Sequence, residues 1–150
     1  MAIARGAGTE ILRAHHFEDL TGAVNTDLII GVQHHIYTVL SVIVSCLGLS
    51  VATHYCALLI YGYDSFGGTT TEEHQIFRQI IAEQETFVWN DKFSFNGFEP
   101  SNFTGPLDNA TKQDAVADQG SGVAQKLLLA TSAASTTYDC NITFIDQNNA

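Results

Sequence analysis

Residues 36–51 read Ile36-Tyr37-Thr38-Val39-Leu40-Ser41-Val42-Ile43-Val44-Ser45-Cys46-Leu47-Gly48-Leu49-Ser50-Val51, and this nearly apolar stretch decides the fold. One interpretation is a membrane-spanning helix, which needs about 20 mostly apolar residues. Residues 36–61 contain no Asp, Glu, Lys or Arg, as such a helix requires.

Two observations favour strands over a helix here. The stretch is rich in β-branched residues, which are typical of strands. No cluster of Lys or Arg flanks either end, although such clusters orient membrane helices. We therefore expect residues 36–61 to form two adjacent antiparallel strands that turn at Gly48, with the membrane helix as the alternative.

The rest of the chain continues this β pattern. Turn signals separate short apolar runs, and no strand–helix–strand rhythm is present, which favours an all-β fold. We predict an antiparallel β-sandwich, jelly-roll-like, of about eight strands. Residues 72–81 also fit helical spacing, and residues 111–118 are predicted to form a short helix. The expected strands are residues 9–20, 27–33, 34–47, 53–64, 72–81, 86–96, 125–132 and 137–147.

Length and composition predict one domain. At 150 residues the chain is long enough to bury a core, and we expect an N-terminal arm over residues 1–8 and a single β-sandwich domain over residues 9–150. The arm lacks the apolar core of a secretory signal. With six Lys and Arg and a formal net charge of −10, the chain has too few cations to neutralise many phosphates. Nucleic-acid binding is therefore not expected.

The chain has three cysteines, Cys46, Cys56 and Cys140, without the spacing of a metal site. Because Cys behaves as a small hydrophobic residue, we expect buried free thiols. A disulfide between Cys46 and Cys56 is the alternative.

Six histidines are the strongest candidates for a metal site: His15, His16, His34, His35, His54 and His74. Neighbouring residues on a strand point to opposite faces, so one member of each adjacent pair could converge with another. Half-buried histidines that bond to the backbone are the simpler interpretation. Asp108, Asp114 and Asp118 could hold calcium but lack EF-hand spacing, and solvated acids are expected instead. We predict no catalytic, cofactor-binding or metal-ligating residues, no cofactor and no enzymatic activity.

Three stretches of the sequence carry a resemblance to known proteins: Ile3-Ala4-Arg5-Gly6-Ala7-Gly8-Thr9-Glu10, Phe87-Val88-Trp89-Asn90-Asp91-Lys92-Phe93-Ser94-Phe95 and Asp114-Ala115-Val116-Ala117-Asp118-Gln119-Gly120. They resemble stretches of small virion structural proteins of tailed bacteriophages, especially marine ones. The resemblance implies an oligomeric β-sandwich on a phage particle, either a capsid decoration (cement) protein or a tail component. None of these stretches has a known chemical role, so no functional residues are carried over.

We therefore expect a non-enzymatic decoration protein located in the virion and assembled in the host cytoplasm. Its expected partners are copies of itself, for example in a trimer, and the major capsid or other virion proteins, with no nucleic acid and no membrane. Surplus apolar residues suggest such a partner, among them Phe66, Phe98, Phe103 and Leu127-Leu128-Leu129. The alternatives are a tail or neck component, a host- or sugar-binding β-sandwich module, and a small metal-dependent enzyme that uses the histidines.

Overall fold

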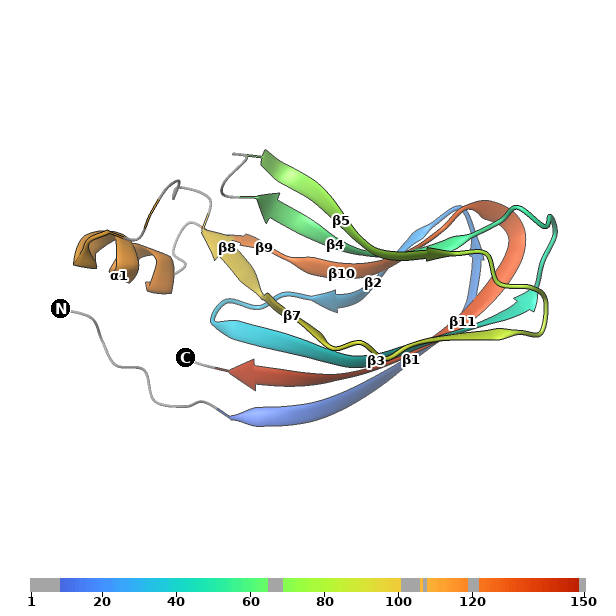
Figure 1. The fold of residues 1–150 in the computed structure, drawn as a ribbon, viewed down its shortest axis with the longest axis horizontal. Helices are drawn as coiled ribbons and strands as arrows, with labels where there is room; N and C mark the ends of the chain where they lie inside the picture. The colour runs from blue at the N-terminus through green and yellow to red at the C-terminus, as the bar shows by residue number, and fades with distance from the viewer. Residues whose placement is uncertain (1–8, 65–68, 101–105, 107, 119–121, 149–150) are drawn as a thin grey trace.

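The computed structural model describes residues 9–64, 69–100, 106, 108–118 and 122–148 and is built almost entirely of antiparallel strands. Two sheets face each other (Figure 1). The first, sheet A, has the order β1–β11–β3–β6, with β7 also paired to β3. Its strands are β1 (Glu10–Gly22), β3 (His35–Gly48), β6 (Thr86–Trp89), β7 (Phe93–Asn96) and β11 (Ala133–Asn148). The all-β sandwich predicted from the sequence is confirmed.

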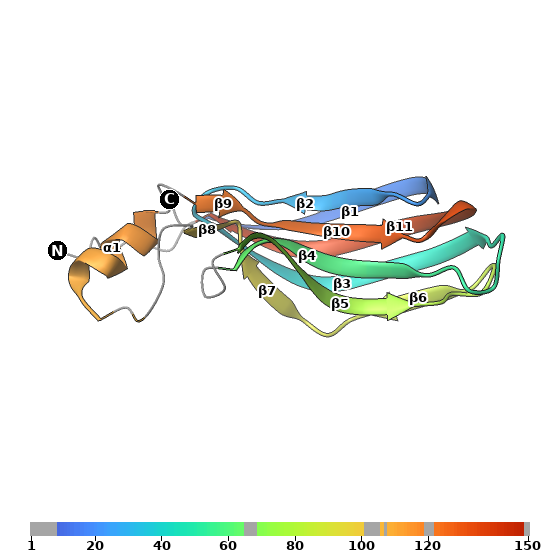
Figure 2. The same ribbon diagram turned by 90° about the horizontal axis from the view of Figure 1, so that it is seen from above.

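The second sheet, sheet B, has the order β2–β10–β4–β5. Its strands are β2 (Asn25–Ile30), β4 (Cys56–Asp64), β5 (Thr69–Gln79) and β10 (Lys126–Thr131). A small third sheet pairs β8 (Phe98–Pro100) with β9 (Gly122–Ala124). It lies at one end of the sandwich together with the helix α1 (Ala110–Asp118), as Figures 1 and 2 show.

The strand pairing is that of a jelly roll. The first strand pairs with the last (β1 with β11), the second with the last but one (β2 with β10), β3 with β6 and β7, and β4 with β5. The chain is therefore one long hairpin wrapped around a core, with eight sandwich strands when β6 and β7 count as one. Residues 98–124, which carry β8, α1 and β9, are an insertion between β7 and β10.

The decisive stretch forms the central strand β3. Its core-facing side chains are at most 3% exposed. The alternate side chains are half-buried between the flanking strands, except Leu47 near the end of the strand, which is exposed. A bulge at Leu40, where the register with β11 shifts, brings both Val39 and Val42 to the core. No helix in the described part of the chain is long and apolar enough to span a membrane. The five core-facing residues are Tyr37, Val39, Val42, Val44 and Cys46.

The predicted pairing of the two strands within residues 36–61 is wrong. β3 belongs to sheet A and β4 to sheet B, so the link between them, residues 49–55, crosses from one sheet to the other. The physical reason is burial. A hairpin would place both apolar strands in one sheet, whereas the crossing lets Val44 of β3 and Leu58 of β4 enter the same core.

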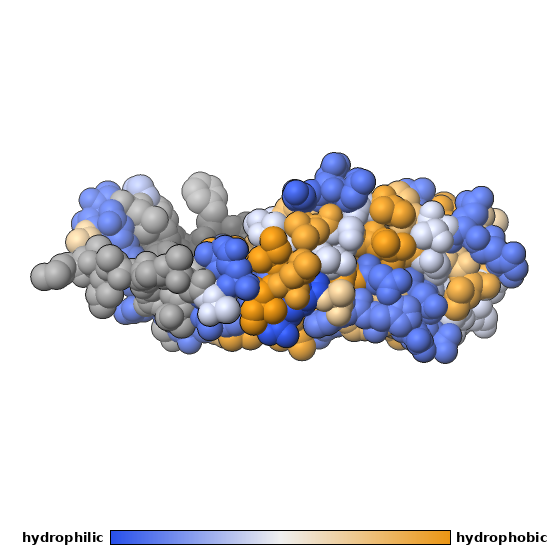
Figure 3. All heavy atoms as spheres, turned by 90° about the horizontal axis from the view of Figure 1, so that it is seen from below, coloured by the Kyte–Doolittle hydropathy of each residue, from blue (hydrophilic) through white to orange (hydrophobic). Residues whose placement is uncertain are grey.

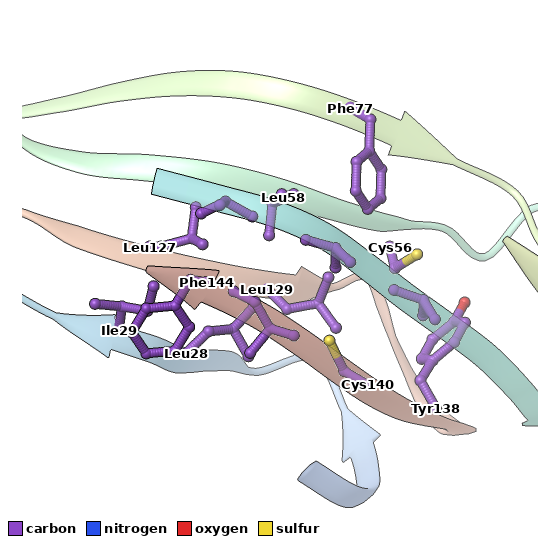
Figure 4. Packing of buried hydrophobic residues seen from close by; sticks show 14 of the residues in the cluster. Leu28, Ile29, Cys56, Leu58, Phe77, Leu127, Leu129, Tyr138, Cys140 and Phe144 are labelled. Atoms are coloured by element: carbon purple, nitrogen blue, oxygen red, sulfur yellow. The ribbon is translucent and has the colours of Figure 1, made fainter. Parts of the chain in front are cut away.

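The core draws side chains from both sheets, and Figure 4 shows its packing. Leu127 and Leu129 of β10 are fully buried there, and Leu128 is 4% exposed on the other face of the strand. Leu127–Leu129 are therefore not the surplus surface expected from the sequence. Phe98 is half-buried on β8, and Phe66 and Phe103 lie outside the described residues.

The predicted short helix is confirmed as α1. The side chain of Asn109 accepts a hydrogen bond of 2.9 Å from the backbone amide of Lys112, which caps the N-terminus of the helix. The predicted strand over 86–96 is two strands, β6 and β7, separated by Asn90-Asp91-Lys92. The predicted arm, residues 1–8, lies outside the described residues.

Candidate functional site

The most unusual element of the sandwich is its first strand. β1 has no buried residue, and ten of its thirteen residues are exposed. It pairs with β11 along one edge, and no described strand pairs with its other edge. Ile11 is 44% and Leu12 is 67% exposed on this strand. A long unpaired edge with exposed apolar side chains is a template for contact with another chain.

The sandwich is open beside this edge. A groove of about 460 Å³ lies where β1 of sheet A and β2 of sheet B face each other. Its walls are mainly apolar and aromatic, with charged groups among them. The lining residues are Arg13, His15, Phe17, Asp27, Leu28, Ile29, Ile30, Val32, Tyr37, Phe144 and Asp146.

A charged network crosses sheet A at this groove. The carboxylate of Asp146 on β11 accepts hydrogen bonds from Arg13 Nε of β1, at 3.2 Å, and from His35 Nδ1 of β3, at 2.6 Å. Asp146 itself is 8% exposed. Since a buried carboxylate is costly without partners, these two bonds hold the three strands in register at the mouth of the groove.

Tyr37 lies beside this network. Burial raises the pKa of Tyr37, and the negative charge of Asp146 raises it further. Its hydroxyl oxygen accepts a hydrogen bond of 3.1 Å from the backbone amide of Val32. The phenol is therefore a neutral structural group that joins β3 to the segment after β2.

The structure separates the histidines. His15 packs edge-on against the Phe144 ring at 5.2 Å, while His16 points to the other face and contacts Asn141 and Glu18. His54 lies in the link after β3, where its Nδ1 is 2.7 Å from the hydroxyl of Thr136 on β11. His74 is exposed on β5. Among the described residues, no three His, Cys, Asp or Glu side chains are grouped to hold a metal ion.

The acids that could have held calcium are spread around the helix. Asp108 pairs with Lys112 at 2.8 Å on the surface, and Asp118 ends α1. No sequence pattern pointed to Asp146 or Arg13, because each is a single charged residue in a strand-like run. Only their pairing across strands distant in sequence brings them together.

The three cysteines are free and buried, as predicted. Burial raises the pKa of Cys56 and of Cys140 to about 12 and also raises that of Cys46. The thiols therefore stay protonated near neutral pH and are poor nucleophiles.

Comparison with family models finds no match for this sequence. Comparison with curated proteins likewise finds none.

Among solved structures, one similar chain comes from Bacillus endospore appendages, described as a family of disulfide-linked pili. It is 12% identical, with a TM-score of 0.44, over 100% of this chain and 97% of that chain. Another comes from T=1 particles derived from infectious bursal virus. It is 10% identical, with a TM-score of 0.48, over 99% of this chain and 34% of that chain.

A chain of the infectious bursal disease virus Gt strain is 9% identical, with a TM-score of 0.43, and this protein spans 32% of its length. None of the three chains is described as a phage protein. The assignment of the jelly roll rests on the strand pairing given above.

Proposed function

We propose that this protein is a non-enzymatic structural protein of a phage particle, acting as a capsid decoration (cement) protein through contacts between copies of itself and with the capsid. The observation that carries the proposal is the outer edge of β1. No described strand pairs with this edge, Ile11 and Leu12 are exposed on it, and the groove lies beside it. The resemblance of three sequence stretches to virion structural proteins supports the particle as the place of action.

The face that includes this edge also has a suitable composition. Viewed from the side of sheet A, patches of apolar residues lie across the middle of the molecule with polar residues between them (Figure 3). Leu12 and Ile145 are cross-strand partners on this outer face, and Val88 of β6 is 52% exposed there beside Ile43. Apolar side chains that are spread over a sheet and its open edge suit an interface between subunits.

The test is the oligomeric state of the purified chain. We expect a closed homo-oligomer by light scattering after size exclusion, since closed symmetry is the common outcome for soluble assemblies. Leu12→Lys places a charge on the edge and should shift the population toward monomers. Val51→Lys is the matched control, because Val51 is 51% exposed in the link between β3 and β4. A full-length chain that stays monomeric and binds no particle would remove the proposal.

The alternative role is a tail or neck component of the same particle. It would use the same edge, so the site does not separate the two roles. Labelling of purified particles with an antibody against this protein distinguishes them, since a decoration protein covers the capsid and a tail component marks one vertex or the tail.

A further inference from the structure

The outer face of sheet B, on the opposite side of the molecule from the face in Figure 3, carries a second and smaller apolar cluster. Ala57, Leu59 and Leu128 are 3%, 9% and 4% exposed although they point away from the main core. Two tyrosines cover them: Tyr61 packs against the cluster, and so does Tyr55, whose ring lies 3.5 Å from the guanidinium carbon of Arg78. This face therefore presents aromatic rings on an apolar floor.

A hollow of about 300 Å³ opens on this face. Across the sheet, Lys126 of β10 lies between Tyr61 of β4 and the edge strand β2, and Glu73 of β5 follows Tyr61 in the same row. Lys126 Nζ is 3.2 Å from Asp27 Oδ2, and both side chains are about one-third exposed. The lining residues are Asn25, Asp27, Tyr61, Glu73, Lys126 and Leu128.

The side chains that line the hollow indicate which class of ligand fits it. An anion would meet two carboxylates against one ammonium group, on a chain with a formal charge of −10. A purely apolar ligand would remove water from the amide, the carboxylates and the ammonium, which is costly even with Lys126 paired to Asp27. A sugar suits both the apolar and the polar side chains that line the hollow. Its C–H face packs on the Tyr61 ring and Leu128. Its hydroxyls donate hydrogen bonds to Asp27 and Glu73 and accept hydrogen bonds from Lys126 and Asn25.

We propose that this hollow binds a neutral sugar residue of a polysaccharide. Its size lies at the small end of the range for ligand pockets, about 300–1,000 Å³, and suits one or two sugar units. The hollow lies on the outer face of sheet B and shares Asp27 with the groove beside β1, but sugar binding in the hollow does not require the proposed assembly role.

Saturation-transfer difference NMR tests the proposal. The probes are D-glucose, D-galactose, D-mannose, N-acetyl-D-glucosamine and lactose at millimolar concentration, with the full chain as the receptor. We expect transfer to the ring protons of at least one probe. Tyr61→Ala should reduce this transfer several-fold, because it removes the stacking surface, and Asp27→Asn should do the same while preserving side-chain shape.

Two controls separate loss of binding in the hollow from other effects of the substitutions. Asp91→Asn changes an exposed acid between β6 and β7, on the other sheet, and should leave the transfer unchanged. Circular dichroism of each variant should match that of the parent chain, and Asp27→Asn remains informative if Tyr61→Ala fails to fold. Absence of transfer from all five probes overturns the proposal, as does transfer that both hollow variants leave intact.

Discussion

At the scale of single residues, the strongest constraint lies at Asp146. Asp146 is 8% exposed, and its carboxylate links β1, β11 and β3 through Arg13 and His35. Such a group stabilises the fold only while both partners are present, because its burial is costly by itself.

Asp146→Asn should lower the free energy of unfolding by about 1–3 kcal/mol, because the neutral amide accepts hydrogen bonds more weakly and presents one oxygen where the carboxylate presents two. Urea unfolding followed by circular dichroism measures the change. Asp108→Asn is the control, since Asp108 pairs with Lys112 on the surface and its loss should cost less than about 0.5 kcal/mol. Equal effects of the two changes would show that the network contributes no more than a surface pair.

The buried thiols predict a loss of stability at alkaline pH. Burial raises the pKa of Cys56 and Cys140 from 9.0 to about 12, so above pH 9 these thiols ionise in the unfolded chain and stay protonated in the folded one. The folded state then binds more protons than the unfolded state, and stability must fall as pH rises from 9 toward 12. Each thiol should cost about 1 kcal/mol at pH 10.

Urea midpoints between pH 8 and pH 11 measure this slope. Cys56→Ala should lower stability near neutral pH through the lost packing and should make the alkaline slope shallower. Tyr138 adds to the remaining slope, because burial raises its pKa to about 12. An unchanged slope in the variant would mean that the thiol of Cys56 ionises equally in both states.

At the scale of elements, local chemistry predicted where strands lie better than how they pair. The β-branched run of β3 and the short helix α1 were correctly placed, since each follows from residues close in sequence. The pairing of β3 with β11 joins residues about a hundred positions apart, and no local pattern encodes it. The exposure of β1 was missed for the same reason, because an edge position depends on the whole topology.

The junction around Gly97 illustrates another such contact. The backbone amide of Gly97 donates to His35 O at 2.8 Å, its carbonyl accepts from Gln125 N at 2.8 Å, and Gly31 N donates to Gln125 O at 2.7 Å. Three distant segments meet here, at the point where the insertion with α1 leaves the sandwich.

Gly97→Ala should therefore destabilise the fold by about 1–3 kcal/mol or more, because its Cβ would overlap the backbone of Val32. Gly48→Ala is the matched control: nothing lies within 4 Å of a Cβ at that position, so little change is expected. Denaturant midpoints of the two variants provide the comparison. Equal midpoints for the two variants would mean that the segments around Gly97 move apart to accommodate the added Cβ without loss of stability.

At the scale of the whole molecule, net charge and exposed apolar surface have opposite effects on self-association. Copies with a formal charge of −10 repel one another, whereas the exposed residues of β1 and the outer face of sheet A favour contact. Salt screens the repulsion, with a Debye length of about 10 Å at 0.1 M and about 3 Å at 1 M, and leaves apolar burial intact. Under the proposed function, assembly should therefore strengthen as ionic strength rises.

Analytical ultracentrifugation over a series of sodium chloride concentrations measures this dependence. The complete interface should bury more than roughly 1,000 Å², as biological contacts do, so the gain from screening should appear as a shift from monomer to a single closed species. Under the proposed function the predicted arm, residues 1–8, takes part in the contact. Deletion of residues 2–8, which lie outside the described residues, should then weaken assembly at every salt concentration. Dissociation on adding salt would instead point to an interface between basic residues of one copy and acidic residues of another, and would contradict the role proposed for the apolar edge.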